Sequence, residues 1–350
     1  MLDSPESGRE GTFAQLPSAL DPPAGVPAVT ADPRTTRKDE RDIATQTGLI
    51  ERTSEPPHLT LGRAKEIYAH REILLNLVRK ELKVKYTASV LGAVWSLLNP
   101  VVFLAVFSFV SIVLGNNIPN FPVYLLAGLL PWNLFSVSIT QASESVLGNS
   151  NLVKKVYFPR EILPLSSVGV ALIDFVLQMA VLLLFMTVTG YAINYSFNTA
   201  FLVLFPLSFA TLLTFTVALS FYLSALNVRY RDVRHLLGLG LLVWFWATPI
   251  VYGSGFVQEK LLEKSLAGVH VFNLYLLNPL VAIICGFQRA LYGVVDPLDP
   301  VTGKPVQVLV AVSVPWLTGV LGIVLACSLA LLWFAWRLFF RLSGDFAEEL

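Results

Sequence analysis

The sequence predicts an all-α integral membrane protein with six transmembrane helices, and three observations lead to this fold class. Charged residues make up only 14% of the 350 residues, hydrophobic residues make up 55%, and the mean hydropathy is +0.64. Soluble domains usually carry about 25% charged residues. Six apolar runs reach the roughly 20 residues that a helix needs to cross a hydrocarbon core. Basic residues also gather in alternate loops between these runs.

Residues 1–58 differ from the rest of the chain, because they are rich in proline, charge and small polar residues. Phe13 is their only aromatic residue, so the segment cannot bury enough apolar surface to offset the entropy of ordering it. No secretory signal is expected, since Asp3 and Glu6 stand where a basic region belongs. We predict a disordered cytoplasmic tail.

Residues 59–86 are predicted to form an amphipathic helix that lies on the membrane surface. Apolar residues such as Ile67, Leu74 and Val78 recur at helical spacing, with basic residues around them. A soluble helix packed on another domain would show the same pattern. The run leads directly into the first apolar span, which favours the interfacial interpretation.

The membrane domain is predicted to cover residues 87–341, followed by a short cytoplasmic tail at 342–350. Its six spans are placed at 91–114, 121–143, 165–190, 200–226, 236–252 and 308–336. A further apolar piece, 272–292, contains Asn278, Pro279 and Arg289. A break of this kind is tolerated only where protein surrounds it, so we predict a re-entrant pair of half-helices on the extracytoplasmic side.

The distribution of lysine and arginine predicts the orientation. Basic residues precede the first span, fill the loops after the second and fourth spans, and follow the sixth. The loops after the first and third spans have none. The positive-inside rule therefore places both termini in the cytoplasm. A full crossing by 272–292 would instead put Arg337 and Arg341 outside.

Residues 155–166, KVYFPREILPLS, resemble a characteristic stretch of the permeases of ABC-2 type exporters. Further similar stretches follow the family's order: VLGAVWSLLNP at 90–100, NVRYRDV at 227–233, ATPIVY at 247–252, and LNPL at 277–280 followed by Arg289. The resemblance covers about residues 61–341. It is strongest to the branch that exports polysaccharides and polyol phosphates, such as O-antigen and teichoic acid, across the bacterial inner or plasma membrane.

The resemblance implies a homodimer around a channel, with a separate ATP-binding subunit docked on each copy. This chain would be no enzyme and would bind no metal or cofactor, since ATP and magnesium belong to the partner. The sequence agrees, because its only Gly-Lys pair, Gly303-Lys304, is followed by Pro305 and not by the Ser or Thr of a phosphate-binding loop. The other expected partners are membrane lipids and a lipid-linked glycan, and no nucleic acid.

By resemblance, residues 151–160 are the coupling helix that receives the movement of the ATPase. Its cations would meet acidic residues of the partner, and its aromatic residues and proline would supply a rigid contact. The residues concerned are Lys154, Lys155, Tyr157, Phe158, Pro159 and Arg160. The alternative is an ordinary basic loop that anchors two helix ends at the lipid headgroups.

Three further groups of residues are candidates for function. The cations Arg79, Lys80, Lys83 and Lys85 could hold the pyrophosphate of the lipid carrier. Arg229, Arg231 and Asp232 form a cytoplasmic turn that could belong to the gate, or the last two could simply pair with each other. The aromatic residues Trp95, Phe103, Phe107, Trp244 and Phe245 could line the channel, or could anchor helices at the headgroups.

Asp174 is the one clear charge within a predicted span. We expect it to make a packing hydrogen bond with a neighbouring span, because a proton relay would need further buried ionisable partners. The competing functions are export of a small hydrophobic drug or lipid, which shares the architecture, and a membrane-embedded enzyme. The enzyme is disfavoured because the four histidines show no grouping.

Overall fold

The structure is a computed structural model that describes residues 61–87, 92, 94–113, 118–156, 158–190, 199–262, 265–266, 269–270, 275, 277–293, 298, 305, 307–344 and 346–349. All of them belong to one unit, Pro57–Leu350. The predicted tail and Tyr157 lie outside the described residues.

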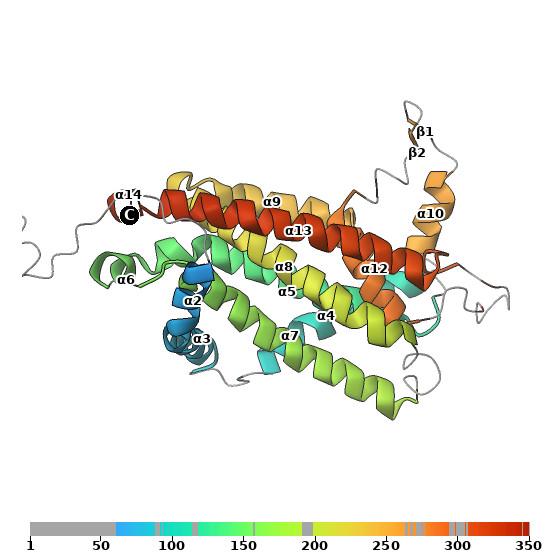
Figure 1. Cartoon of the computed structure of the whole chain (residues 1–350). Helices are drawn as coiled ribbons and strands as arrows, with labels where there is room; N and C mark the ends of the chain where they lie inside the picture. Colours follow the sequence, from blue (N-terminus) through green and yellow to red (C-terminus); the bar gives the residue numbers. More distant parts are fainter. Residues whose placement is uncertain are drawn as a thin grey trace, which may run out of the picture. The chain divides into compact units, whose positions relative to one another are not determined.

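Among the described residues, five helices are long and apolar enough to cross a membrane. They are α4 (Val94–Val113), α5 (Phe121–Gly148), α7 (Ile162–Val188), α8 (Thr199–Arg229) and α13 (Val314–Ser343). Four of them, α5, α7, α8 and α13, run lengthwise through the unit (Figure 1). The prediction of a helical membrane domain is confirmed, since the described residues are nearly all helical, and the long helices match the predicted spans except at their ends.

The predicted fifth span corresponds to a shorter helix, α9 (Val233–Trp246). Its 14 residues would extend about 21 Å at the usual rise per residue, against a hydrocarbon core of about 30 Å. The helix ends before Thr248 because Pro249 disfavours helical conformation in the residue that precedes it. Six full crossings therefore stay a prediction.

The helices pack around α8, which contacts α5, α12 (Pro279–Leu291) and α13. The largest core cluster includes fully buried aromatic side chains such as Phe135 of α5 and Phe287 of α12. Gly286 permits the close approach of α12 to α8, because a β-carbon at this position would overlap Ser208.

The unit has two distinct ends (Figure 1). At one, called here the α6 end, lie α6 (Ser150–Lys155), α14 (Phe346–Glu349) and the turn between α8 and α9. At the other lie α10 (Ser254–Leu262), α12 and the two short strands β1 (Ser265–Leu266) and β2 (Val269–His270). The strands pair antiparallel and were not predicted from the sequence.

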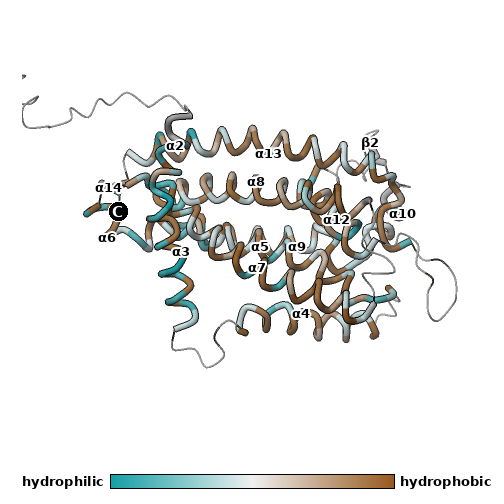
Figure 2. Tube along the Cα trace, turned by 60° about the horizontal axis from the view of Figure 1, so that its bottom comes forward, coloured by the Kyte–Doolittle hydropathy of each residue, from teal (hydrophilic) through white to brown (hydrophobic). Residues whose placement is uncertain are grey.

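The predicted amphipathic helix is two helices, α2 (Leu61–Ala69) and α3 (Arg71–Tyr86), broken at His70. Both lie near the α6 end, and Figure 2 shows α3 as a largely hydrophilic segment beside the more hydrophobic bundle. Leu77 and Val78 of α3 are buried, and α3 packs on α7. The contact is close, since a β-carbon at Gly169 of α7 would lie 2.9 Å from Val78 Cγ2.

The helix α12 corresponds to the second half of the predicted re-entrant pair, and the first half lies mostly outside the described residues, so the pair stays a prediction. Asn278 caps α12 by accepting a hydrogen bond from the Leu280 amide at 3.1 Å, and Pro279 follows as the first helical residue. Asn278 also accepts a hydrogen bond from Trp244 Nε1 at 2.8 Å. Nearly every residue of α12 is buried, so protein surrounds this side of the break.

Candidate functional site

The predicted coupling segment forms the short helix α6 and the turn into α7. Lys154, Lys155 and Val156 are exposed to solvent at the α6 end. Phe158 and Pro159 are buried, and Phe158 belongs to a second core cluster with residues of α3, α7, α13 and α14. The two lysines are therefore presented on a segment that is fixed from beneath by packed side chains.

Glu161 is a buried acidic residue at the start of α7, only 1% exposed. It accepts a hydrogen bond from Trp336 Nε1 of α13 at 3.5 Å. A carboxylate at this position is favoured by the partial positive charge at the beginning of a helix. Arg160 beside it is half-buried. The junction thus joins α7 to α13 through a polar contact as well as through apolar packing.

The four predicted headgroup-binding cations occupy different environments on α3. Arg79 and Lys83 are exposed. Lys80 donates a hydrogen bond to Asn149 Oδ1 at 3.4 Å, so it bridges α3 to the α5–α6 junction. Lys85 forms an ion pair with Asp174 of α7 at 2.5 Å.

Asp174 is only 8% exposed and is held by two residues at the end of α3. Besides the ion pair with Lys85, its Oδ1 accepts a hydrogen bond from the Tyr86 hydroxyl at 2.6 Å. Burial, followed by the hydrogen bond to Asp174, raises the pKa of Tyr86 above its ordinary value. The packing role expected from the sequence fits this geometry, but the partners lie on α3 and not on a neighbouring span.

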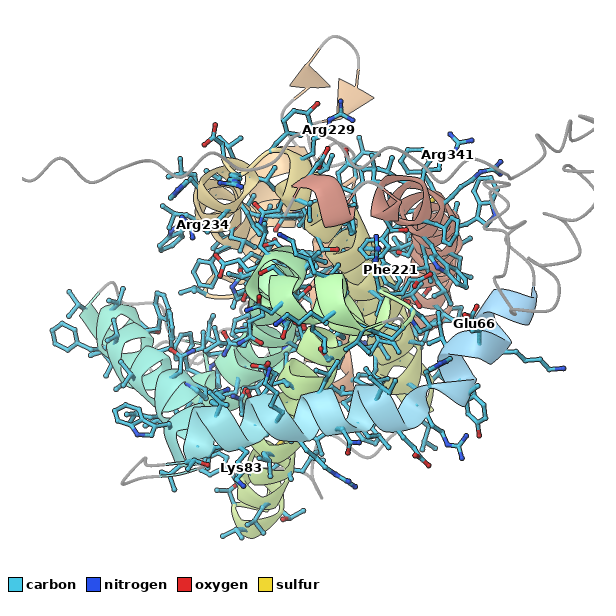
Figure 3. All side chains as sticks on the ribbon, turned by 90° about the vertical axis from the view of Figure 1, so that its left-hand side faces the viewer. Glu66, Lys83, Phe221, Arg229, Arg234 and Arg341 are labelled. Atoms are coloured by element: carbon cyan, nitrogen blue, oxygen red, sulfur yellow. The ribbon has the colours of Figure 1, made fainter. Side chains whose placement is uncertain are left out.

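The turn between α8 and α9 exposes Arg229, Arg231 and Asp232. No ion pair joins Arg231 to Asp232 within the described part of the chain. The ion pair at this turn is instead made by Arg234 of α9, whose Nη1 lies 3.7 Å from Glu144 Oε1 of α5. Figure 3 looks at this end and shows Arg229 and Arg234 at its surface.

The predicted channel-lining aromatic residues separate into three groups. Phe103, Phe107 and Phe245 form a chain of stacked rings, with centroids 5.8 Å and 6.2 Å apart, that joins α4 to α9. Trp244 turns inward, where its ring lies 5.3 Å from Phe135. Trp95 is 53% exposed at the start of α4. The first group therefore links α4 to α9, whereas Trp244 links α9 to α5.

A family model described as ABC-2 type transporter matches residues 73–290. The chain belongs to the ABC-2 type transporter family. The match includes most of α3, the predicted coupling segment and the α8–α9 turn, so it covers all of the predicted functional residues of this ABC-2 family member.

Curated relatives agree with this assignment. The chain is 34% identical over 287 residues to the "O-antigen export system permease protein RfbA" of Myxococcus xanthus, across 82% of this chain and 98% of that protein. Two proteins of the same name from Klebsiella pneumoniae are each 34% identical over 190 residues, across 54% of this chain and 72% of their own length. The similarity to the Myxococcus protein thus extends well beyond the individual motifs.

Two charged residues of this ABC-2 family member were missed by reasoning from the sequence. Glu144 was placed just beyond a span predicted to end at 143, whereas α5 continues to Gly148. Glu161 was given no role, whereas it is buried. The signal for Glu144 is present in the sequence, because Asn133, Ser136 and Thr140 precede it at helical spacing.

Proposed function

We propose that this chain is the permease subunit of an ATP-driven exporter that moves a lipid-linked polysaccharide or polyol phosphate polymer out of the bacterial cytoplasm. The observation that carries the proposal is the similarity to an O-antigen export permease over 98% of that relative's length. The polymer would cross the inner or plasma membrane through helices that this chain supplies.

ATP hydrolysis is assigned to a separate subunit, which would bind ATP and magnesium and dock at the α6 end. Lys154 and Lys155 are the proposed contact, because they are exposed there and can face acidic side chains of the partner. Phe158 ties the segment to the second core cluster, which includes Ile162 and Leu163 of α7. A push on α6 would then be passed to α7, since packed interiors transmit strain.

A second copy of the chain is proposed to complete the channel beside α4 and α9. None of the residues of α9 is buried. In α4, only 17% of the residues in its 18-residue apolar segment are buried. Gly238 and Gly240 of α9 have open space around them. Small residues allow close helix approach in membranes, which suits a contact between two copies.

The exposed cations of α3 are proposed to hold the phosphate groups of the lipid carrier. Arg79 and Lys83 suit this role, because both are exposed and Arg matches phosphate geometry while Lys acts as a compact point charge. Lys85 is engaged with Asp174, so its contribution to phosphate binding is expected to be smaller. The α6 end would then be cytoplasmic, as would both termini.

The decisive experiment deletes the gene and follows the polymer. We expect lipid-linked polymer to accumulate inside the cell and to be lost from the surface, with both defects restored by the intact gene. The purified chain should also bring down the ATP-binding subunit encoded with it. Normal surface polymer in the deletion strain would overturn the proposed substrate.

The proposed orientation predicts a pattern of thiol labelling. In a chain with Cys285 and Cys327 replaced by alanine, cysteine at Asn117 or Asn194 should react with an impermeant thiol reagent added to intact cells. Cysteine at Ser150 of α6 should react only after the cells are opened. Labelling at Ser150 in intact cells would reverse the topology.

A further inference from the structure

The most buried of the five long helices has an exposed face that is polar. In α5, 72% of the residues in its 18-residue apolar segment are buried. The positions that stay at least partly open between 133 and 144 are Asn133, Ser136, Val137, Thr140, Gln141 and Glu144. Residues three or four apart lie on one side of a helix, so these positions form a continuous stripe. Nearer the start of α5 the open positions are Pro122 and Leu126, both apolar.

The polar stripe of α5 differs from the exposed faces of α7 and α13. In α7 the exposed large side chains include Val176, Leu184 and Val188, and in α13 they include Ile323 and Phe334. Such faces suit lipid tails. Carboxylate and amide side chains within a spanning helix instead face protein or a water-filled space, because hydrocarbon cannot satisfy their hydrogen bonds.

The stripe begins beside the aromatic rings that join α4 to α9. Trp132, one residue before Asn133, has its ring 5.5 Å from that of Phe245, which in turn stacks on Phe107. Asn133 Nδ2 is buried and has no hydrogen-bond partner among the described residues. Ring contacts therefore connect α5, α9 and α4 at the level where the polar stripe starts.

The stripe ends in the ion pair between Glu144 and Arg234 of α9. The two side chains are 48% and 57% exposed, so the pair adds little to stability. In between, the Thr140 hydroxyl donates to the Ser136 carbonyl at 2.7 Å, and the lone pairs of that hydroxyl are left to accept. The face thus offers hydroxyl acceptors and the Asn133 amide donor along its length. The weak ion pair between Glu144 and Arg234 lies at the end of the stripe.

We infer that the stripe from Asn133 to Glu144 is a hydrated wall of the translocation path and contacts the hydroxyl groups of the polymer. Glu144 and Arg234 stand at its mouth at the α6 end, and the aromatic rings of Phe107, Phe245 and Trp132 close its far end. The identity of the polymer rests on the proposed function, whereas the hydration of the face rests on α5 alone.

Thiol accessibility tests the hydrated face without any assay of export. In the chain lacking Cys285 and Cys327, co-expressed with its ATP-binding subunit, Thr140→Cys is treated in inside-out vesicles with 2-sulfonatoethyl methanethiosulfonate. A thiolate attacks the sulfenyl sulfur of this charged reagent and displaces methanesulfinate, and thiolates form readily only in water. The matched control is Phe334→Cys. Thr140 lies eight residues before the end of α5 at Gly148, and Phe334 lies nine residues before the end of α13 at Ser343.

We expect Thr140→Cys to react at least about tenfold faster than Phe334→Cys, since only the former thiol would ionise in water. Equal, slow reaction at both positions would overturn the hydrated face. So would a disulfide formed between two copies through Thr140→Cys, because the stripe would then be a contact between subunits.

Export by a second variant tests what passes along the face. Thr140→Trp should fill the path and abolish surface polymer, while Phe334→Trp, on the apolar face of α13, should leave export unchanged. Both variants should retain the ATP-binding subunit. If Thr140→Cys is accessible but Thr140→Trp exports normally, the polymer does not pass along this wall. If surface polymer were instead normal in the deletion strain, the proposed substrate would be wrong. The thiol accessibility of Thr140→Cys would still show that the face is hydrated.

Discussion

Replacing Lys154 and Lys155 together with glutamate is expected to remove the ATP-binding subunit from the purified chain and to abolish export. Both side chains are exposed at the α6 end, so the change places negative charge against the acidic surface proposed for the partner. Like charges juxtaposed at an interface cost several kcal/mol, and a loss of about 3 kcal/mol weakens binding roughly 100-fold. Recovery of the subunit by affinity purification measures this loss directly.

The matched control reverses two charges at the same end on another helix. Arg337 and Arg341 of α13 are also exposed, and Figure 3 shows Arg341 at the same end of the unit. The double variant Arg337→Glu, Arg341→Glu changes the net charge at the α6 end by the same amount. We expect it to leave recovery of the ATP-binding subunit largely intact. Normal recovery and normal export in the Lys154→Glu, Lys155→Glu variant would make α6 a simple headgroup anchor.

The design leaves Phe158, Pro159 and Arg160 untouched for a structural reason. Phe158 and Pro159 are buried, and large-to-small changes at buried aromatic residues typically cost about 3–5 kcal/mol. Arg160 is half-buried beside Glu161. Changes at these positions would disturb the packing of α6 on the bundle, and a loss of export would then say nothing about docking.

The long helices of the membrane domain could be predicted from the sequence because hydropathy alone determines whether a segment avoids water. The start of α5 at Phe121 and the apolar run of α7 follow directly from it. Hydropathy does not say which side of a helix faces another helix. Of the predicted channel-lining residues, Phe107 and Phe245 meet, whereas Trp244 turns into the core, and that difference depends on how α9 rotates against α5.

The partners of charged residues could not be predicted for a similar reason. Lys85 was assigned to lipid phosphate because it belongs to a basic run, yet its partner Asp174 is 89 residues further along the chain. Glu144 was assigned to a loop because the predicted span stopped at 143. Pairs of this kind form only after helices pack, so a single sequence contains no local sign of them.

Breaking the Lys85–Asp174 pair is expected to give the largest loss of stability of the variants considered. The Asp174 side chain is 11% exposed, and the Lys85 side chain is 35% exposed. Removing one partner of a buried pair costs about 3–5 kcal/mol, because the other charge is left without compensation. Lys85→Met leaves the more buried Asp174 carboxylate without its cation, so this variant should lose the most stability of the single variants. Asp174→Leu should cost less, since the partly exposed lysine can reach water along its flexible stem.

The double variant Lys85→Met, Asp174→Leu distinguishes an ion pair that fixes α3 on α7 from a residue that carries protons. With no charge left to compensate, the double variant should be more stable than Lys85→Met alone. A loss of 3 kcal/mol corresponds to a fall of roughly 6–12 °C in Tm for a domain of this size, which thermal unfolding in detergent can resolve. If Asp174→Asn kept the native Tm but lost export, the carboxylate would serve proton transfer, and the packing role that Lys85 and Tyr86 indicate would be wrong.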